Sequence, residues 1–287
     1  MTKKEDKISH SLQIPKGIRY TGKFLEAISP KLATLFAAKL FVTPIKHKIP
    51  KREWSMNQNS IQSSIKIPKI DKEIVIYKYG LSNKKVLLIH GWSGRGTQLY
   101  KIADALIENG YATISFDAPA HGKSKGNKTL MPEFIACILE IEKHFGPFEF
   151  AIGHSLGGMA LLNALKQNFT IKKAIVIGSG DVIQEIIDDF VQKIGLNPKL
   201  GFKLKEHFEK KYGEPMEDYG SSIVSKDIYQ QILIIHDKND EEVDVKAAYQ
   251  INESLKSSQL IITEGLGHRK ILGDKIVIEN SIKFLKE

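Results

Sequence analysis

Cysteine is nearly absent from this sequence, with Cys137 the single one among 287 residues. A lone cysteine can form no internal disulfide, which is typical of a reducing compartment, so we expect a cytoplasmic protein. Because Cys137 lies in an apolar helical pattern, we interpret it as a small buried hydrophobe. No His-Glu-x-x-His motif or paired Cys-x-x-Cys is present, so we expect no metal and no cofactor.

Long hydrophobic runs are missing as well. The most apolar stretch, residues 32–42, is interrupted by Lys39. It is too short to span a bilayer, which takes about 20 apolar residues. It also begins too late, and lacks the small-residue cleavage pattern, for a secretory signal.

Acidic residues are scarce in one part of the chain only, although the formal net charge is +9. Residues 1–52 hold 12 Lys and Arg but 3 Asp and Glu, whereas the rest of the chain holds 30 of each sign. An enzyme acting on nucleic acid would carry its positive charge around the active cleft. The neutral body therefore predicts that nucleic acid is not a partner.

The basic residues belong to an N-terminal arm, residues 1–58, in which the pattern predicts two helices over 18–28 and 31–42. We interpret these helices as packed on the body of the protein. A second interpretation is that residues 17–48 rest on an anionic membrane surface, as basic amphipathic segments do. The protein would then be peripheral to the inner face of the membrane.

After the arm, short apolar segments alternate with helical patterns over residues 59–287. The predicted strands are 61–67, 73–79, 85–89, 112–116, 148–152, 174–177, 232–235 and 260–263. The predicted helices are 98–109, 132–145, 155–167, 245–255 and 270–285. This alternation predicts an α/β domain with a mostly parallel sheet covered by helices on both faces, its first two strands forming an antiparallel edge.

One interval, residues 181–230, breaks the alternation because no strand fits before its end. It has helical patterns over 182–194 and 199–212 instead. We interpret this insertion as a helical cap over the carboxyl edge of the sheet, where open α/β sheets bind their ligands.

The most informative motif is Gly-His-Ser-Leu-Gly over residues 153–157, between a predicted strand and a predicted helix. A turn of this kind holds Ser155 in a strained conformation that pushes its Oγ out of the sheet. The flanking glycines are needed because a Cβ on either side would collide with the neighbouring strand or helix. The amide of Leu156 then lies at a helix N-terminus, which favours a developing negative charge.

This strand–turn–helix pattern, with later acidic and histidine turns, resembles the α/β-hydrolase family over about residues 60–287. The resemblance implies an eight-stranded sheet and makes Ser155 the nucleophile. In that family the acid and the histidine follow the nucleophile in chain order. The loop Glu-Gly-Leu-Gly-His after the last predicted strand thus places His268 as the base.

The acid is assigned by the same resemblance, and alternatives stay open. The segment 232–240 resembles the family's acid turn, in which the acid lies four residues after the position of His236, and this selects Asp240. Asp237 occupies a slot where relatives usually have glycine. Some relatives carry the acid after the preceding strand, which would be Asp181. The remaining acidic residues of this loop are interpreted as solvated.

The resemblance also implies a second amide for an oxyanion. His-Gly-Trp at 90–92 resembles the family's His-Gly-x motif, so the amide of Trp92 would join that of Leu156. We expect His90 to be structural, bonding backbone around its turn. The side chains of Trp92 and His154 are candidates for contact with substrate.

Together these residues predict a serine hydrolase that cleaves a small-molecule carboxylic ester, or a related acyl bond, through an acyl-enzyme on Ser155. A thioesterase, a lysophospholipase, an amidase and a carbon–carbon hydrolase would use the same machinery, and a non-catalytic ligand-binding protein is the alternative from another class. Serine at the nucleophile position argues against dehalogenases and epoxide hydrolases, which use a carboxylate there. The sequence leaves the oligomeric state open.

Overall fold

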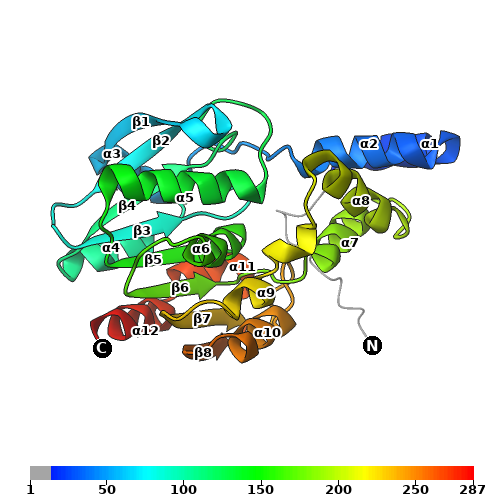
Figure 1. The fold of residues 1–287 in the computed structure, drawn as a ribbon. Coiled ribbons are helices and arrows are strands. Elements are labelled where there is room, and N and C mark those ends of the chain that lie inside the picture. The colour runs from blue at the N-terminus through cyan, green and yellow to red at the C-terminus, as the bar shows by residue number, and fades with distance from the viewer. Residues whose placement is uncertain (1–13) are drawn as a thin grey trace, which may run out of the picture. The chain divides into compact units, whose positions relative to one another are not determined.

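The computed structural model describes residues 14–287 (Figure 1). The described chain forms two compact units. Residues 14–42 and 183–217 make up the first, which we call the helical unit. Residues 43–182 and 218–287 make up the second, the α/β unit. The first 13 residues of the predicted arm lie outside the described residues.

A single eight-stranded sheet runs through the α/β unit in the order β1-β2-β4-β3-β5-β6-β7-β8. The strands are β1 (Ile61–Ile67), β2 (Lys72–Tyr79), β3 (Lys85–Ile89), β4 (Ala112–Asp117), β5 (Phe150–His154), β6 (Lys173–Ile177), β7 (Gln231–Asp237) and β8 (Ser258–Thr263). β1 pairs antiparallel with β2, and β2 with β4, while all other pairs are parallel. The predicted mostly parallel, eight-stranded sheet with an antiparallel edge is confirmed.

The central strands are nearly continuous runs of Val, Ile, Leu and Ala because helices cover both of their faces. The helices of this unit are α3 (Trp54–Asn59), α4 (Tyr100–Glu108), α5 (Met131–Phe145), α6 (Leu156–Lys166), α9 (Ser221–Ser225), α10 (Lys246–Ser254), α11 (Gly267–Lys270) and α12 (Lys275–Lys286). On one face, Leu88 and Ile235 of the sheet share a core with Leu106 of α4 and Phe284 of α12. Burying each such side chain contributes about 1.5–3 kcal/mol to folding.

The predicted helix over 270–285 is wrong at its beginning. The chain forms the short helix α11, then a 3₁₀ turn at Ile271–Gly273, and only then α12. The cause is Asp274, which caps α12 by accepting a hydrogen bond from the amide of Val277 at 3.1 Å. His268, which the sequence predicts in a loop, lies on α11.

The helical unit consists of α1 (Lys16–Ile28), α2 (Pro30–Phe41), α7 (Ile183–Lys193) and α8 (Leu200–Tyr212). α2 packs on α7 and α8 through Phe41. The ring centroid of Phe41 lies 5.1 Å from that of Phe190 on α7 and 5.6 Å from that of Phe208 on α8. Residues 14–42 of the predicted arm thus fold together with residues 183–217. Within residues 14–287, every helix is too short or too polar to cross a bilayer.

Candidate active site

Ser155 lies at the apex of the turn between β5 and α6, with φ 54° and ψ −123°. This is a conformation that side-chain-bearing residues rarely adopt. A Cβ at Gly153 would lie 2.5 Å from the carbonyl oxygen of Gly157, and one at Gly157 would lie 2.5 Å from the carbonyl oxygens of Ile89 and His90. The strained serine and the need for both flanking glycines therefore match the turn that the motif predicts. Ser155 itself is half-buried.

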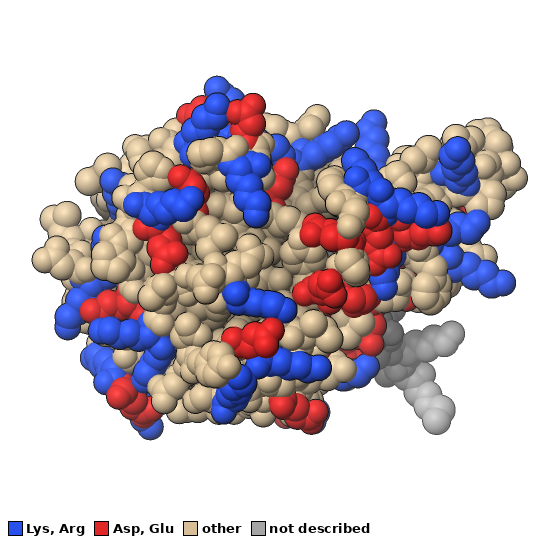
Figure 2. All heavy atoms as spheres, viewed as in Figure 1, with Lys and Arg blue, Asp and Glu red and all other residues tan. Residues whose placement is uncertain are grey.

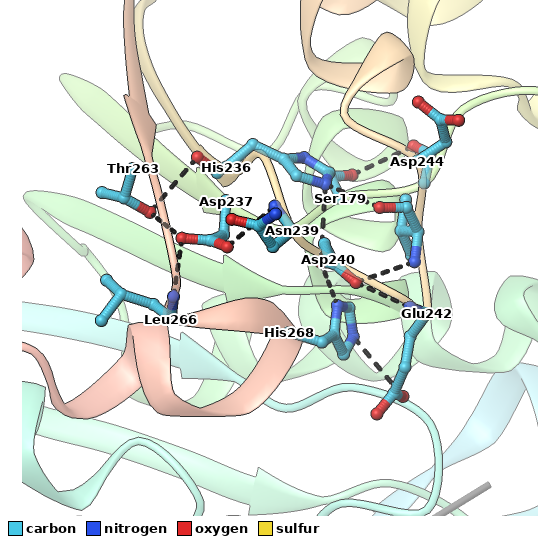
Figure 3. A network of polar contacts seen from close by, with 12 residues as sticks. Ser179, His236, Asp237, Asn239, Asp240, Glu242, Asp244, Thr263, Leu266 and His268 are labelled. Atoms are coloured by element: carbon cyan, nitrogen blue, oxygen red, sulfur yellow. Dashed lines mark hydrogen bonds and ion pairs between the residues drawn. The ribbon is translucent and has the colours of Figure 1, made fainter. Parts of the chain in front are cut away.

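His268 and Asp240 meet at the carboxyl end of the sheet (Figure 3). His268 comes from α11 and Asp240 from the loop after β7, and His268 Nδ1 lies 2.7 Å from Asp240 Oδ2. Both side chains are buried. Because the carboxylate faces Nδ1, that nitrogen carries the proton and leaves Nε2 of the neutral ring as the acceptor.

The Asp240 carboxylate is held in its ionised form. Burial alone would raise its pKa, but the hydrogen bond from His268, the charge of that ring and two backbone amides together hold the pKa below its usual value. The amides are those of Glu242 and Val243, at 2.8 and 2.9 Å from Asp240 Oδ1. Asp240 is therefore charged at neutral pH and fixed in place from both sides.

The two other candidate acids have different partners. Asp237 accepts hydrogen bonds from the Thr263 hydroxyl at 2.7 Å and from the amides of Asn239 and Leu266 at 3.0 Å (Figure 3). It thereby ties the end of β7 to the segment that leads into α11. Asp181 accepts instead from the amide of Ser222 at 2.7 Å. Of the three carboxylates, Asp240 is the one hydrogen-bonded to His268.

The ring of His154 links the serine turn to the histidine. His154 Nε2 donates to the carbonyl oxygen of His268 at 2.9 Å, and the two ring centroids lie 4.6 Å apart. Complete burial holds the pKa of His154 well below its usual value, so the ring is neutral. Since His154 directly precedes Ser155, this bond brings the serine and His268 to the same end of the sheet.

Within residues 14–287, no hydrogen bond joins Ser155 Oγ to His268. His268 Nε2 lies 3.9 Å from Glu242 Oε2, and Arg269 Nε lies 3.0 Å from the other oxygen of Glu242. Hydrogen bonds of catalytic groups are often long in ligand-free proteins and tighten when substrate binds. Glu242 belongs to the acidic loop that the sequence led us to interpret as solvated, and no local pattern distinguishes it.

The loop after β3 lies against the serine. A Cβ at Gly91 would lie 2.9 Å from the Cβ of Ser155, so the backbone leading to Trp92 passes close to the turn. Leu156 is the first residue of α6, and its amide is one of the helix-terminal donors that no helical turn satisfies. The Trp92 ring packs edge-on against His121, with the centroids 5.4 Å apart.

Two buried neutral histidines hold this loop. His90 Nε2 accepts from the amide of Ala118 and His121 Nε2 from that of Ser93, each at 3.0 Å. In both rings Nδ1 faces a carbonyl oxygen and therefore carries the proton. Burial lowers the pKa of His90 to about 4, and burial together with the charge of His90 lowers that of His121 to about 3. The predicted structural role of His90 is confirmed.

These histidines predict an acid-sensitive fold. Between pH 6.5 and 4 these histidines are protonated in the unfolded chain, where their pKa is about 6.5, but stay neutral in the folded protein. The free energy of unfolding therefore decreases as the pH falls through this range. We expect His90→Gln to reduce this slope by about 1.4 kcal/mol per pH unit, measured by urea unfolding between pH 7.5 and 4.5. His144→Gln, at a half-exposed ring, is the control. An unchanged slope in the His90 variant would contradict the assignment.

The backbone strain at Ser155 predicts an unusual order of stabilities. Ser155→Ala keeps a Cβ at positive φ, whereas Ser155→Gly removes it, so we expect the glycine variant to be more stable by about 1 kcal/mol in urea unfolding. At Ser64, an exposed residue of β1, the order should reverse because glycine weakens a regular strand. Equal stability of the two Ser155 variants would show that the turn is not strained.

A groove elsewhere on the α/β unit is separate from the predicted site residues. A groove of about 890 Å³ between α4 and α12 is lined mainly by charged side chains, none of them among the predicted site residues. Within the described residues, no group of three or more His, Cys, Asp and Glu side chains is arranged to hold a metal ion.

Comparison with known proteins identifies the fold. Residues 84–193 match the family model described as alpha/beta hydrolase fold. Among solved structures, a protein provisionally named a lipase (lip1) from Acinetobacter baumannii AYE is 22% identical, with a TM-score of 0.63 over 84% of this chain and 97% of that one. The esterase EaEST from Exiguobacterium antarcticum is 19% identical, with a TM-score of 0.60 over 76% of this chain and 97% of that one.

A third structure extends over more of the chain. It is a membrane phospholipase A, described as a bacterial virulence factor, that is 14% identical with a TM-score of 0.62 over 94% of this chain and 99% of that one. A comparison with curated protein sequences gave no match. The predicted resemblance to the α/β-hydrolase family is confirmed in the fold.

Proposed function

We propose that this protein, which has the α/β-hydrolase fold, is a serine hydrolase that cleaves carboxylic esters through an acyl-enzyme on Ser155. The observation that carries the proposal is the buried hydrogen bond between His268 and Asp240, at the end of the sheet where the strained Ser155 turn lies. Structures named lipase and esterase among the fold neighbours support a hydrolase that acts on esters.

The first step is attack by Ser155 on the ester carbonyl. A serine hydroxyl is a weak nucleophile at neutral pH, so a base must take its proton. His268 Nε2 is the acceptor position of the neutral ring and receives that proton. Asp240, already ionised, keeps Nδ1–H in place and stabilises the imidazolium that forms.

The tetrahedral intermediate carries a negative charge on the former carbonyl oxygen. The amides of Trp92 and Leu156 donate to this oxygen, and the N-terminus of α6 adds a favourable field. Imidazolium then returns its proton to the leaving alcohol and the acyl-enzyme forms. A water molecule, deprotonated by His268, attacks the acyl carbonyl. Collapse of this second tetrahedral intermediate releases the acid, and His268 returns the proton to Ser155 Oγ.

Covalent labelling tests the three assigned residues. We expect a fluorophosphonate probe to label the wild-type protein at Ser155, because the Oγ of an activated serine displaces fluoride from phosphorus and forms a covalent phosphonyl adduct. Ser155→Ala should abolish labelling, and Asp240→Asn should slow it by about 10³–10⁴-fold because the imidazole loses its orienting carboxylate. The measurement is the rate of labelling followed by mass spectrometry of the modified peptide.

Matched carboxylate variants make the labelling test specific. Asp244→Asn removes an exposed carboxylate of the same loop, and Asp181→Asn removes the alternative acid. Both should label at close to the wild-type rate. Labelling of the wild type no faster than of Ser155→Ala would favour a non-catalytic binding protein, and loss of labelling in Asp181→Asn alone would move the acid to that residue.

The bond type is tested with a substrate panel. We expect p-nitrophenyl esters of increasing acyl length to be hydrolysed with a kcat/KM at least tenfold above that for acyl-CoA and acyl-anilide substrates, with Ser155→Ala inactive on all. For the anilide, the reason is that its nitrogen must be protonated before it leaves. For acyl-CoA, whose thiolate is a good leaving group, the expectation rests on the fold neighbours named lipase and esterase. A higher kcat/KM on acyl-CoA would identify a thioesterase, and one on the anilide an amidase.

A further inference from the structure

The first helix of the helical unit has an exposed apolar face. Tyr20, Phe24 and Ile28 are 72, 66 and 59% exposed. Because residues four apart lie above one another on a helix, these three form a stripe along α1. Gly22 is buried on the other side, where a Cβ would lie 3.0 Å from the Leu196 side chain. α1 therefore packs through one face and exposes large apolar side chains on the other.

The next helix also exposes apolar side chains. Leu32 and Leu35 of α2 are 43 and 44% exposed. Single exposed apolar residues are common on proteins, but five on two consecutive helices indicate an interaction surface. We call these five residues, Tyr20, Phe24, Ile28, Leu32 and Leu35, the apolar stripe.

The charges on α1 and α2 are mostly positive. Residues 14–42 contain five Lys and Arg and a single acidic residue, Glu26. Glu26 is turned toward the loop after α7, where its carboxylate accepts a hydrogen bond from the amide of Asn197 at 3.2 Å. Lys16 and Lys23 are exposed on α1 and Lys31 on α2. Figure 2 shows mostly uncharged atoms over α1 with basic side chains beside them.

We propose that the apolar stripe and its lysines bind the surface of an anionic phospholipid membrane. Apolar and aromatic side chains would enter the boundary between headgroups and acyl chains, while the lysines pair with anionic headgroups, as in interfacial amphipathic helices. A helix of 13 residues is about 20 Å long, which is shorter than the hydrocarbon core of a bilayer. We therefore propose that α1 lies along the membrane surface and does not cross it. The charge favours lipid over a second copy of the chain, which would bring like charges together.

Vesicle co-sedimentation of the full-length protein tests this proposal. We expect binding to vesicles of phosphatidylcholine with about one-third phosphatidylglycerol, and weak binding to phosphatidylcholine alone. Phe24→Ser with Ile28→Ser should lower the partition coefficient at least tenfold, because two apolar side chains that would enter the membrane are lost. Lys16→Gln with Lys23→Gln should lower it by about 25-fold, roughly fivefold for each lysine.

Matched controls lie on the α/β unit. Leu81 and Tyr229 are 96 and 76% exposed there, so Leu81→Ser with Tyr229→Ser should leave binding within twofold of the wild type. Lys69→Gln with Lys128→Gln removes two exposed lysines of that unit and should likewise have a small effect. Urea unfolding of each variant shows that it is folded.

Three outcomes would overturn the proposal. They are equal pelleting of the wild type with neutral and anionic vesicles, an unchanged partition coefficient in the stripe variants, and a lipid-free dimer in sedimentation velocity that the stripe variants convert to monomer. The last result would assign the stripe to a second copy. Ser155→Ala should bind vesicles like the wild type, so failure of membrane binding and failure of the proposed hydrolysis are read separately.

Discussion

The hydrogen bond between the Asp240 carboxylate and His268 Nδ1 is the contact on which the candidate site depends. It joins the loop after β7 to α11, two segments that the chain separates by 28 residues. A bond between an ionised carboxylate and a ring N–H is short and strong, and burial strengthens it further. It fixes both the tautomer and the orientation of the ring. Without it, the proton of the neutral His268 ring could lie on Nε2, which then could not act as a base.

Other buried polar groups support that contact from behind. Asp237 ties β7 to the segment before α11, and His154 donates to the backbone of His268. These bonds are made by groups that carry no role in the proposed reaction, yet they set where His268 lies. His90 and His121 must be neutral because the Nε2 atom of each accepts a hydrogen bond from a backbone amide. The arrangement of the loop beside Ser155 and the acid sensitivity of the fold therefore have the same physical origin.

Much of the fold and of the site could be predicted because the relevant signals are local. Apolar runs of five residues gave the central strands, and Gly153 and Gly157 identified the turn at Ser155 before its φ was known. His268 and Asp240 followed from the resemblance to the α/β-hydrolase family, which places the histidine after the last strand and the acid four residues after the position of His236. The structure joins Asp240 to His268.

Other features could not be read from local patterns because they depend on contacts between distant segments. Nothing around Glu242 indicates that its carboxylate lies 3.9 Å from His268 Nε2. The apolar pattern of residues 270–285 looked continuous, and only the cap made by Asp274 shows why α12 begins later. The packing of α1 and α2 with α7 and α8 joins parts of the chain that lie about 150 residues apart. An amphipathic pattern shows that one face of a helix is buried, but it does not indicate which segment covers that face.

The most direct measurement is a crystal structure of the protein after reaction with an alkyl fluorophosphonate. We predict density joining Ser155 Oγ to phosphorus, a phosphoryl oxygen within hydrogen-bond distance of the Trp92 and Leu156 amides, and His268 Nε2 turned toward the adduct while Nδ1 stays on Asp240. An adduct on another residue, or a His268 ring whose Nε2 points away from Ser155, would contradict the account.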